Sequence, residues 1–209
     1  MSFKQATDNE EAYKFKGRYG RWIKINSTSP SPLFVLAFKG EKIGTRKSYV
    51  MDILSSVLGD GNSSYYQKKF VKSRRPLLNN VSVSNYTLKY NGVFFLMGEL
   101  LRGVNINKFK NRLFKDFKNI CDNAITERSL QKTKNQYFQG YYRGIQTNAG
   151  IASFLGNRES YFNDYEYYKK ELSIYNSITV AELKSTCKQV FKDKDYTLIT
   201  SWNKHPKKK

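Results

Sequence analysis

Histidine and cysteine are scarce in this sequence of 209 residues, which contains one histidine, His205, and two cysteines, Cys121 and Cys187. Histidine-based zinc sites, Ser-His-Asp triads and Cys-His pairs all need an imidazole in a built pocket. Because His205 stands in a lysine-rich tail, these site classes are excluded for this chain. Both cysteines occupy apolar positions of predicted helices, so we expect two buried thiols in preference to a disulfide.

Long apolar runs are also missing. The best run, 93–97, is interrupted by Gly98 and Glu99, far short of the roughly 18 to 20 apolar residues that a membrane span needs. No membrane span is therefore predicted. The N-terminal stretch 1–17 is polar and charged and lacks the apolar segment of a signal peptide. An initiating methionine on an excised fragment would look the same, so export stays open.

Acidic side chains are few: 17 Asp and Glu face 37 Lys and Arg, for a net charge of +20. Such an excess is typical of proteins that bind a nucleic acid, an acidic membrane surface or an acidic partner, but it also occurs where the proteins of the source organism are basic in general. The lysines are scattered over all polar faces and cluster only at 72–75 and 207–209. This distribution favours a solvated surface over nucleic-acid binding. With 39% hydrophobic residues the chain can build the core of one domain and is not intrinsically disordered.

The apolar pattern predicts five strands, over 19–26, 33–38, 81–90, 93–101 and 196–202. The dipeptide Asn91-Gly92 suits a type I′ turn that would join the third and fourth strands as an antiparallel hairpin. Within the third strand the apolar residues change from odd to even positions, which predicts a β-bulge near Ser84-Asn85.

Helical periodicity predicts apolar stripes over 50–58, 106–121, 130–155 and 180–191, and a shorter helix over 64–73. Thr45, Thr126 and Thr179 are the expected N-caps, and Gly59 is the expected residue after the first helix. Each main helix has one apolar and one charged face, so it can cover one side of a sheet. The predicted fold class is therefore α+β: a two-layer sandwich in which helices pack on one face of a largely antiparallel sheet of about five strands. Five side chains should be buried, namely Ile53, Leu54, Val57, Phe109 and Phe117.

Several phrases, taken in their order, resemble the pitrilysin/insulinase-type zinc peptidases, which include the mitochondrial processing peptidases. They are the turn phrase LSSVLGDGNSSYYQKKF over 54–70, the strand phrase GRWIK over 20–24, Thr126 at the start of a long helix, and ITVAEL over 178–183. The resemblance covers about 19–202 and is to the second half of each chain in that family, which binds no zinc. It implies a linker at 1–18, a single inactive peptidase-like domain at 19–202 and a basic tail at 203–209.

Catalysis in that family uses an inverted zinc motif, His-x-x-Glu-His, which this sequence lacks. The resemblance therefore implies that this chain has no catalytic or metal-binding residue and no cofactor, and that zinc belongs to a partner domain. The inactive half often supplies an arginine and a tyrosine that hold substrate, and these positions fall here on Val71 and on Asn79 or Asn80. A shifted alignment would offer Arg74 or Arg75 for substrate or partner contact, although a solvated helix end is the favoured interpretation of both.

The function that the resemblance implies is that of a non-catalytic half. Such a half pairs with a zinc-bearing peptidase domain, in the same or another chain, to enclose and help bind peptide substrate. A dimer is left open, and the family resemblance suggests the bacterial periplasm or cell envelope. The alternative is a free-standing basic module that binds nucleic acid or an acidic partner, but no recognised nucleic-acid motif supports it.

Overall fold

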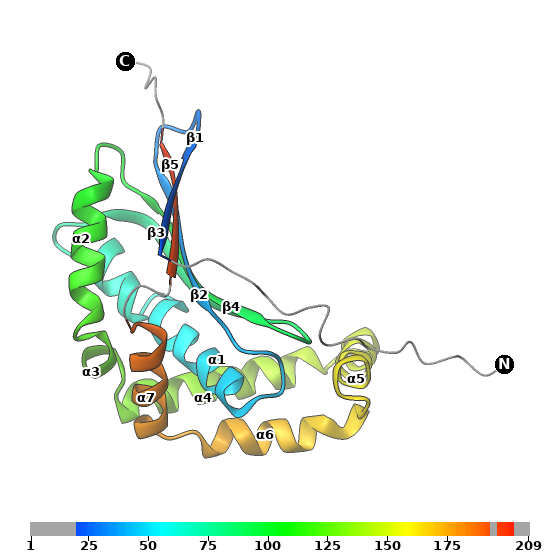
Figure 1. The fold of residues 1–209 in the computed structure, drawn as a ribbon. Helices are drawn as coiled ribbons and strands as arrows, with labels where there is room; N and C mark the ends of the chain where they lie inside the picture. The colour runs from blue at the N-terminus through cyan, green and yellow to red at the C-terminus, as the bar shows by residue number, and fades with distance from the viewer. Residues whose placement is uncertain (1–19, 193–195, 203–209) are drawn as a thin grey trace.

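The computed structural model describes residues 20–192 and 196–202. These residues form one sheet with helices packed against one of its faces, which confirms the predicted α+β sandwich (Figure 1). The predicted linker at 1–18 and the basic tail at 203–209 lie outside the described residues.

The sheet contains β1 (Arg21–Asn26), β2 (Leu33–Lys39), β3 (Leu78–Thr87), β4 (Gly92–Leu100) and β5 (Tyr196–Trp202). Their spatial order is β1-β5-β2-β4-β3, so that β1 and β3 are the edge strands. All neighbouring pairs are antiparallel except β1 with β5, which run parallel. The first and last strands of the domain therefore lie side by side.

The hairpin of β3 and β4 forms as predicted, but its turn does not. Residues 88–91 connect the strands, the Leu88 N–H donates to the Asn91 carbonyl at 2.8 Å, and neither Asn91 nor Gly92 has positive φ. The type I′ prediction was therefore wrong. A side chain at Gly92 would instead place its Cβ 2.2 Å from the carbonyl oxygen of Glu41, so glycine is needed for a close backbone approach.

The predicted bulge near Ser84-Asn85 was also misplaced, because the register of β3 shifts between Leu78 and Asn80. Asn85 keeps its regular position opposite Phe94 and donates from Nδ2 to Asp52 Oδ1 at 2.8 Å. The apolar pattern therefore changes because Asn85, a polar residue, occupies a position on the face of β3 that the helices cover.

Helix α1 (Arg46–Gly59) begins after Thr45, whose side chain accepts from the Ser48 N–H, as predicted. The helix includes Gly59, where a Cβ would lie 2.3 Å from the Val83 nitrogen, so the glycine lets α1 pack closely on β3. Ten of its residues are buried, more than a single stripe, because α4 and α6 cover the side turned away from the sheet (Figure 1).

The remaining helices differ from the prediction, since two predicted helices are each divided and η3 and α6 were not predicted. They are the π-helix η2 (Gln67–Val71), α2 (Ile106–Phe117), α3 (Ile120–Ala124), α4 (Glu127–Gly144), α5 (Asn148–Phe162), the 3-10 helix η3 (Tyr165–Tyr167), α6 (Tyr168–Ser177) and α7 (Val180–Val190). The predicted helix over 106–121 divides into α2 and α3, and the one over 130–155 into α4 and α5. A new cap explains the second break, since the Thr147 side chain accepts from the Gly150 N–H.

The two cysteines form a disulfide, so the prediction of separate thiols was wrong. The break between α2 and α3 lets α3 pack on α7 and brings the two Cα atoms to 5.7 Å, although 66 residues separate Cys121 from Cys187 in sequence. Both residues are buried, as their apolar positions predicted.

Of the five side chains predicted to be buried, Ile53, Leu54, Val57 and Phe109 are buried in the core. Phe117 is only partly buried, because it lies at the last turn of α2, where its ring stacks on Phe191 with centroids 4.7 Å apart.

Candidate functional site

The sheet face turned away from the helices carries a band of apolar side chains. Side chains alternate along each strand, so that Phe34, Leu36 and Phe38 of β2 are buried while Leu33, Val35 and Ala37 lie on the other face. Cross-strand pairing places Ile23, Ile199, Val35 and Met97 side by side in one row. We call this surface the open face, and its exposed apolar members are Ile23, Ile25, Leu33, Tyr86 and Met97.

Exposure of this kind is informative because Leu33 and Met97 are 48% and 42% exposed although they stand in the middle three strands of the sheet. Single exposed apolar residues are ordinary, but a contiguous patch of them marks a contact surface. The open face is therefore the part of the described chain best suited to a protein or peptide partner.

Arg74 and Arg75, the two candidate contact residues, lie between η2 and β3 and are both exposed. Within the described part of the chain neither forms a salt bridge. The position aligned with the family arginine, Val71, is half-buried and packs against the core. Asn80, aligned with the family tyrosine, is exposed on β3, where its Nδ2 donates to Glu99 Oε2 at 3.3 Å. The two arginines thus come immediately before an edge strand of the sheet.

The described residues do not fit a zinc site. They contain no group of three His, Cys, Asp or Glu side chains that could hold a metal ion. Both cysteines are joined in the disulfide, and His205 lies outside the described residues. This donor set cannot build the three-ligand centre of a zinc hydrolase.

A buried polar network links α1, β3 and α6, and the sequence reasoning missed it. Asp52 accepts from the Tyr175 hydroxyl at Oδ2, at 2.7 Å, and from Asn85 Nδ2 at Oδ1. Burial of the carboxylate raises the pKa of Asp52 from 3.8 to about 6, even though both hydrogen bonds act to lower it. The only sequence signal was an aspartate within the apolar stripe of the first helix.

A raised carboxyl pKa is typical of acid–base groups in clefts, and Asp52 does line a hollow of about 310 Å³ together with Tyr137 and Gly140. Both of its oxygens are already hydrogen-bonded within the protein. A second buried pair, Arg158 with Glu171, likewise joins two helices, α5 and α6, at 2.5 Å. We interpret these groups as structural, because Asp52 joins α1 to β3 and α6, and the pair of Arg158 and Glu171 joins α5 to α6.

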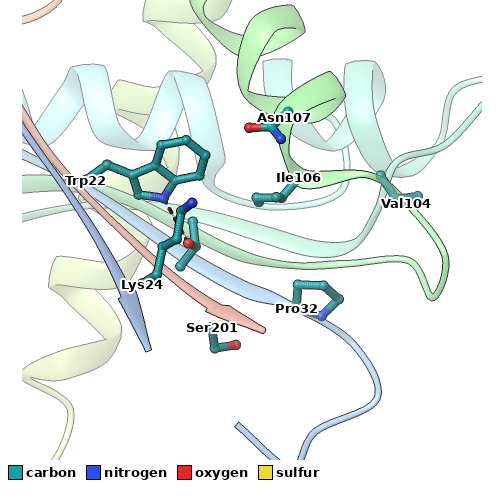
Figure 2. A pocket seen from close by; sticks show the side chains of 8 residues that line it. Trp22, Lys24, Pro32, Val104, Ile106, Asn107 and Ser201 are labelled. Carbon is teal, nitrogen blue, oxygen red and sulfur yellow. Dashed lines mark hydrogen bonds between the residues drawn. The ribbon is translucent and has the colours of Figure 1, made fainter. Parts of the chain in front are cut away.

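A pocket of about 200 Å³ lies where β1, β2 and β5 meet the start of α2 (Figure 2). Trp22 forms one wall and donates from Nε1 to Thr200 Oγ1 at 2.9 Å. No sequence pattern indicates this pocket, because its residues come from four separate stretches. They are Trp22, Lys24, Pro32, Val104, Ile106, Asn107, Thr200 and Ser201.

Residues 4–137 match the family described as the peptidase M16 inactive domain, which is more than half of the chain. The protein therefore belongs to this family, and it is an inactive domain of the zinc peptidase class rather than an enzyme by itself. The match confirms the resemblance that the turn and cap phrases indicated. Comparison with curated proteins gave no match.

Solved structures share the fold at low sequence identity. A protease from Helicobacter pylori is 18% identical with a TM-score of 0.78, over 87% of this chain and 44% of that one. The peptidase M16 inactive domain from Pseudomonas fluorescens is 16% identical with a TM-score of 0.73, over 88% and 42%. The periplasmic protease PqqL from Escherichia coli is 9% identical with a TM-score of 0.69, over 87% and 20%. The chain thus spans less than half the length of each of these proteins.

No helix among the described residues is long and apolar enough to cross a membrane.

Proposed function

We propose that this chain is the non-catalytic half of a zinc peptidase, which pairs with a zinc-bearing domain to enclose and help bind a peptide. The zinc-bearing domain would lie in the same or another chain; the protease from Helicobacter pylori is more than twice as long as the aligned part, which leaves room for such a domain. The observation that carries the proposal is the open face, an apolar surface that no described helix covers.

The chemistry of the described residues supports a role in contacting the partner domain and the peptide, and not in cleaving the peptide. The described residues contain no group of three side chains that could hold a metal ion, so we expect the partner domain to supply the activation of water. Contact with the partner or with substrate would remove the apolar side chains of the open face from water, at roughly 25 cal/mol for each Å² of apolar surface. The net charge of +20 would in addition attract acidic peptides.

The first experiment mixes this chain with a separately produced zinc-bearing domain and measures cleavage of a fluorogenic peptide. Alone, the chain should bind no stoichiometric zinc and cleave nothing, whereas the mixture should be active and sensitive to a chelator. A mixture without activity, or chelator-sensitive cleavage by the pure chain alone, would contradict the proposal. Salt-dependent binding of an oligonucleotide, with no effect of the zinc domain, would favour the alternative of a nucleic-acid module.

The open face is tested by Met97→Glu, which places a charge in the middle of the apolar band. We expect at least tenfold weaker association with the zinc-bearing domain, because the carboxylate would have to be desolvated at the contact. Asn111→Glu is the matched control, since Asn111 is exposed on α2 in the helical layer and the substitution changes the net charge by the same single unit. Equal effects of the two substitutions would show that net charge, and not the open face, governs association.

Arg74 and Arg75 are tested by alanine substitution in the reconstituted enzyme. If they are a solvated chain segment, each substitution should change kcat/KM by less than threefold. A loss on the order of 100-fold, typical of removing one oxyanion donor, would show that they take the part of the family arginine.

We also propose an oxidising location, the bacterial periplasm or cell envelope. Disulfides persist in such compartments and are rare in the cytosol, and this chain joins Cys121 to Cys187. The structurally similar PqqL is a periplasmic protease. Fractionation of cells that make the native protein, followed by thiol labelling, tests the proposal; a cytosolic protein with two free thiols would refute it.

A further inference from the structure

We propose that the pocket beside Trp22 binds the C-terminal residue of a peptide, with an apolar side chain in the cavity and the terminal carboxylate at Lys24. The proposal rests on the proposed function only in assuming that peptides are the ligands of this domain. It assigns a binding site at the opposite sheet edge from Arg74 and Arg75, next to β1 instead of β3.

The size of the pocket fits one side chain. Sites for whole small molecules usually measure about 300 to 1,000 Å³. This pocket measures about 200 Å³. An apolar cavity of about 150 Å³ can hold a benzene ring. A single aromatic or branched aliphatic side chain is therefore the expected occupant.

The walls of the pocket are apolar and held in place. The ring of Trp22 is fixed by its hydrogen bond to Thr200, which is buried in the sheet. Pro32 before β2, Val104 before α2 and Ile106 in its first turn provide further apolar walls, as Figure 2 shows. Because these residues lie in packed strands and helices or directly beside them, the cavity exists before any ligand binds.

Positive charge surrounds the aromatic wall. The ammonium groups of Lys24 and Lys110 lie 4.4 Å and 3.9 Å from the centroid of the Trp22 ring. Among the described residues no acidic side chain lines the pocket, and none forms a salt bridge with either lysine. Two cations near one ring repel each other, so an anion bound beside Lys24 would relieve that repulsion.

The anion expected here is a carboxylate and not a phosphate. Phosphates are typically held by free backbone N–H groups at a helix N-terminus. At the start of α2 the side chain of Asn105 already accepts from the N–H groups of Asn107 and Lys108. A monoanion that needs only a single ammonium partner is therefore the better match.

The position of the pocket at an edge strand favours a peptide over a free acid. Trp22 and Lys24 belong to β1, which pairs with β5 on one side and with no described strand on the other. An extended peptide can add to such an edge through main-chain hydrogen bonds while its side chains enter pockets. The last residue of the added peptide would then reach the cavity.

The test titrates the full chain with an acetylated hexapeptide that ends in phenylalanine, as the free acid and as the C-terminal amide. Binding is measured by calorimetry and by the shift of the Trp22 indole N–H signal in ¹H–¹⁵N spectra, identified with the Trp202→Phe variant. We expect the acid to bind at least tenfold more tightly than the amide, and Lys24→Gln to reduce this ratio to less than threefold. Lys108→Gln is the matched control and should leave the ratio unchanged, since Lys108 is exposed in the first turn of α2 and does not line the pocket.

Ile106→Trp should fill the cavity and abolish binding of the acid, with an unchanged circular dichroism spectrum as evidence of folding. Equal binding of acid and amide, an unmoved Trp22 signal, or the same ratio in Lys24→Gln would overturn the proposal. Acetyl-phenylalanine binding as tightly as the hexapeptide would refute a peptide ligand in favour of a free acid. Because only this chain is used, these failures are distinguishable from a failure to pair with a zinc-bearing domain.

Discussion

Replacing Asp52 by asparagine should stabilise the domain at neutral pH. The change keeps the shape of the side chain: its oxygen can still accept from Asn85, and its new NH₂ group can donate to the oxygen of Tyr175. What the substitution removes is a charge that burial makes unfavourable, since burial raises the pKa of Asp52 from 3.8 to about 6.

The sign and size of the effect follow from the pKa shift. In the unfolded chain Asp52 ionises near its ordinary pKa, so the folded state binds the proton more tightly. The contribution of Asp52 to stability is therefore greatest at low pH, falls as the pH rises from about 4 to about 6, and stays reduced above that. A shift of about two pKa units corresponds to at most about 3 kcal/mol. Because Asp52 lines a hollow and is only half-buried as a whole residue, we expect a gain of about 1 to 3 kcal/mol.

Urea unfolding at pH 4, 5, 6 and 7 measures the difference between Asp52→Asn and the wild type. The free energy of unfolding should differ little at pH 4, and the variant should be more stable at pH 7. Glu171, whose pKa burial also raises, is present in both proteins and does not enter the comparison directly. Asp60→Asn, at an exposed position just after the same helix, is the control. An equal difference at all four pH values, or a less stable variant at pH 7, would refute the reasoning.

Two further predictions concern stability. Replacing both Cys121 and Cys187 by serine should lower the free energy of unfolding by about 4 kcal/mol, because the disulfide closes a long loop. A reductant should destabilise only the wild type. A loss below about 1 kcal/mol would show that the disulfide does not restrict the unfolded chain as this reasoning requires. Gly59→Ala should cost about 1 to 3 kcal/mol, since its Cβ would meet the Val83 nitrogen. Gly140→Ala, with open space around the new Cβ, should raise the free energy of unfolding by up to about 1 kcal/mol. If both alanine substitutions stabilise the protein, or both destabilise it, the packing argument is wrong.

Of the two candidate contact surfaces, the open face could be predicted from sequence patterns and the pocket beside Trp22 could not. Alternation along β2 and β4 already divides each strand into two faces, so an open face with apolar members follows once helices cover the other side. The pocket beside Trp22 could not be predicted in this way, because it needs β1 to pair with β5 across the whole length of the domain. Lys24 and Lys110 acquire a shared partner only through that pairing and the docking of α2.

The sequence by itself determined the local features of this protein. Thr45, Thr126 and Thr179 accept from backbone N–H groups within three residues, so their role as caps is independent of the rest of the fold. The lack of a histidine pair likewise excludes a histidine-based zinc centre for any fold of this chain. The tertiary structure decided the features that join distant segments, which are the disulfide, the packing of α3 on α7, and the pairing of Asp52 with Asn85 and Tyr175. These depend on which apolar faces pack together, and that choice is made by the summed packing of the whole core and not by any local pattern.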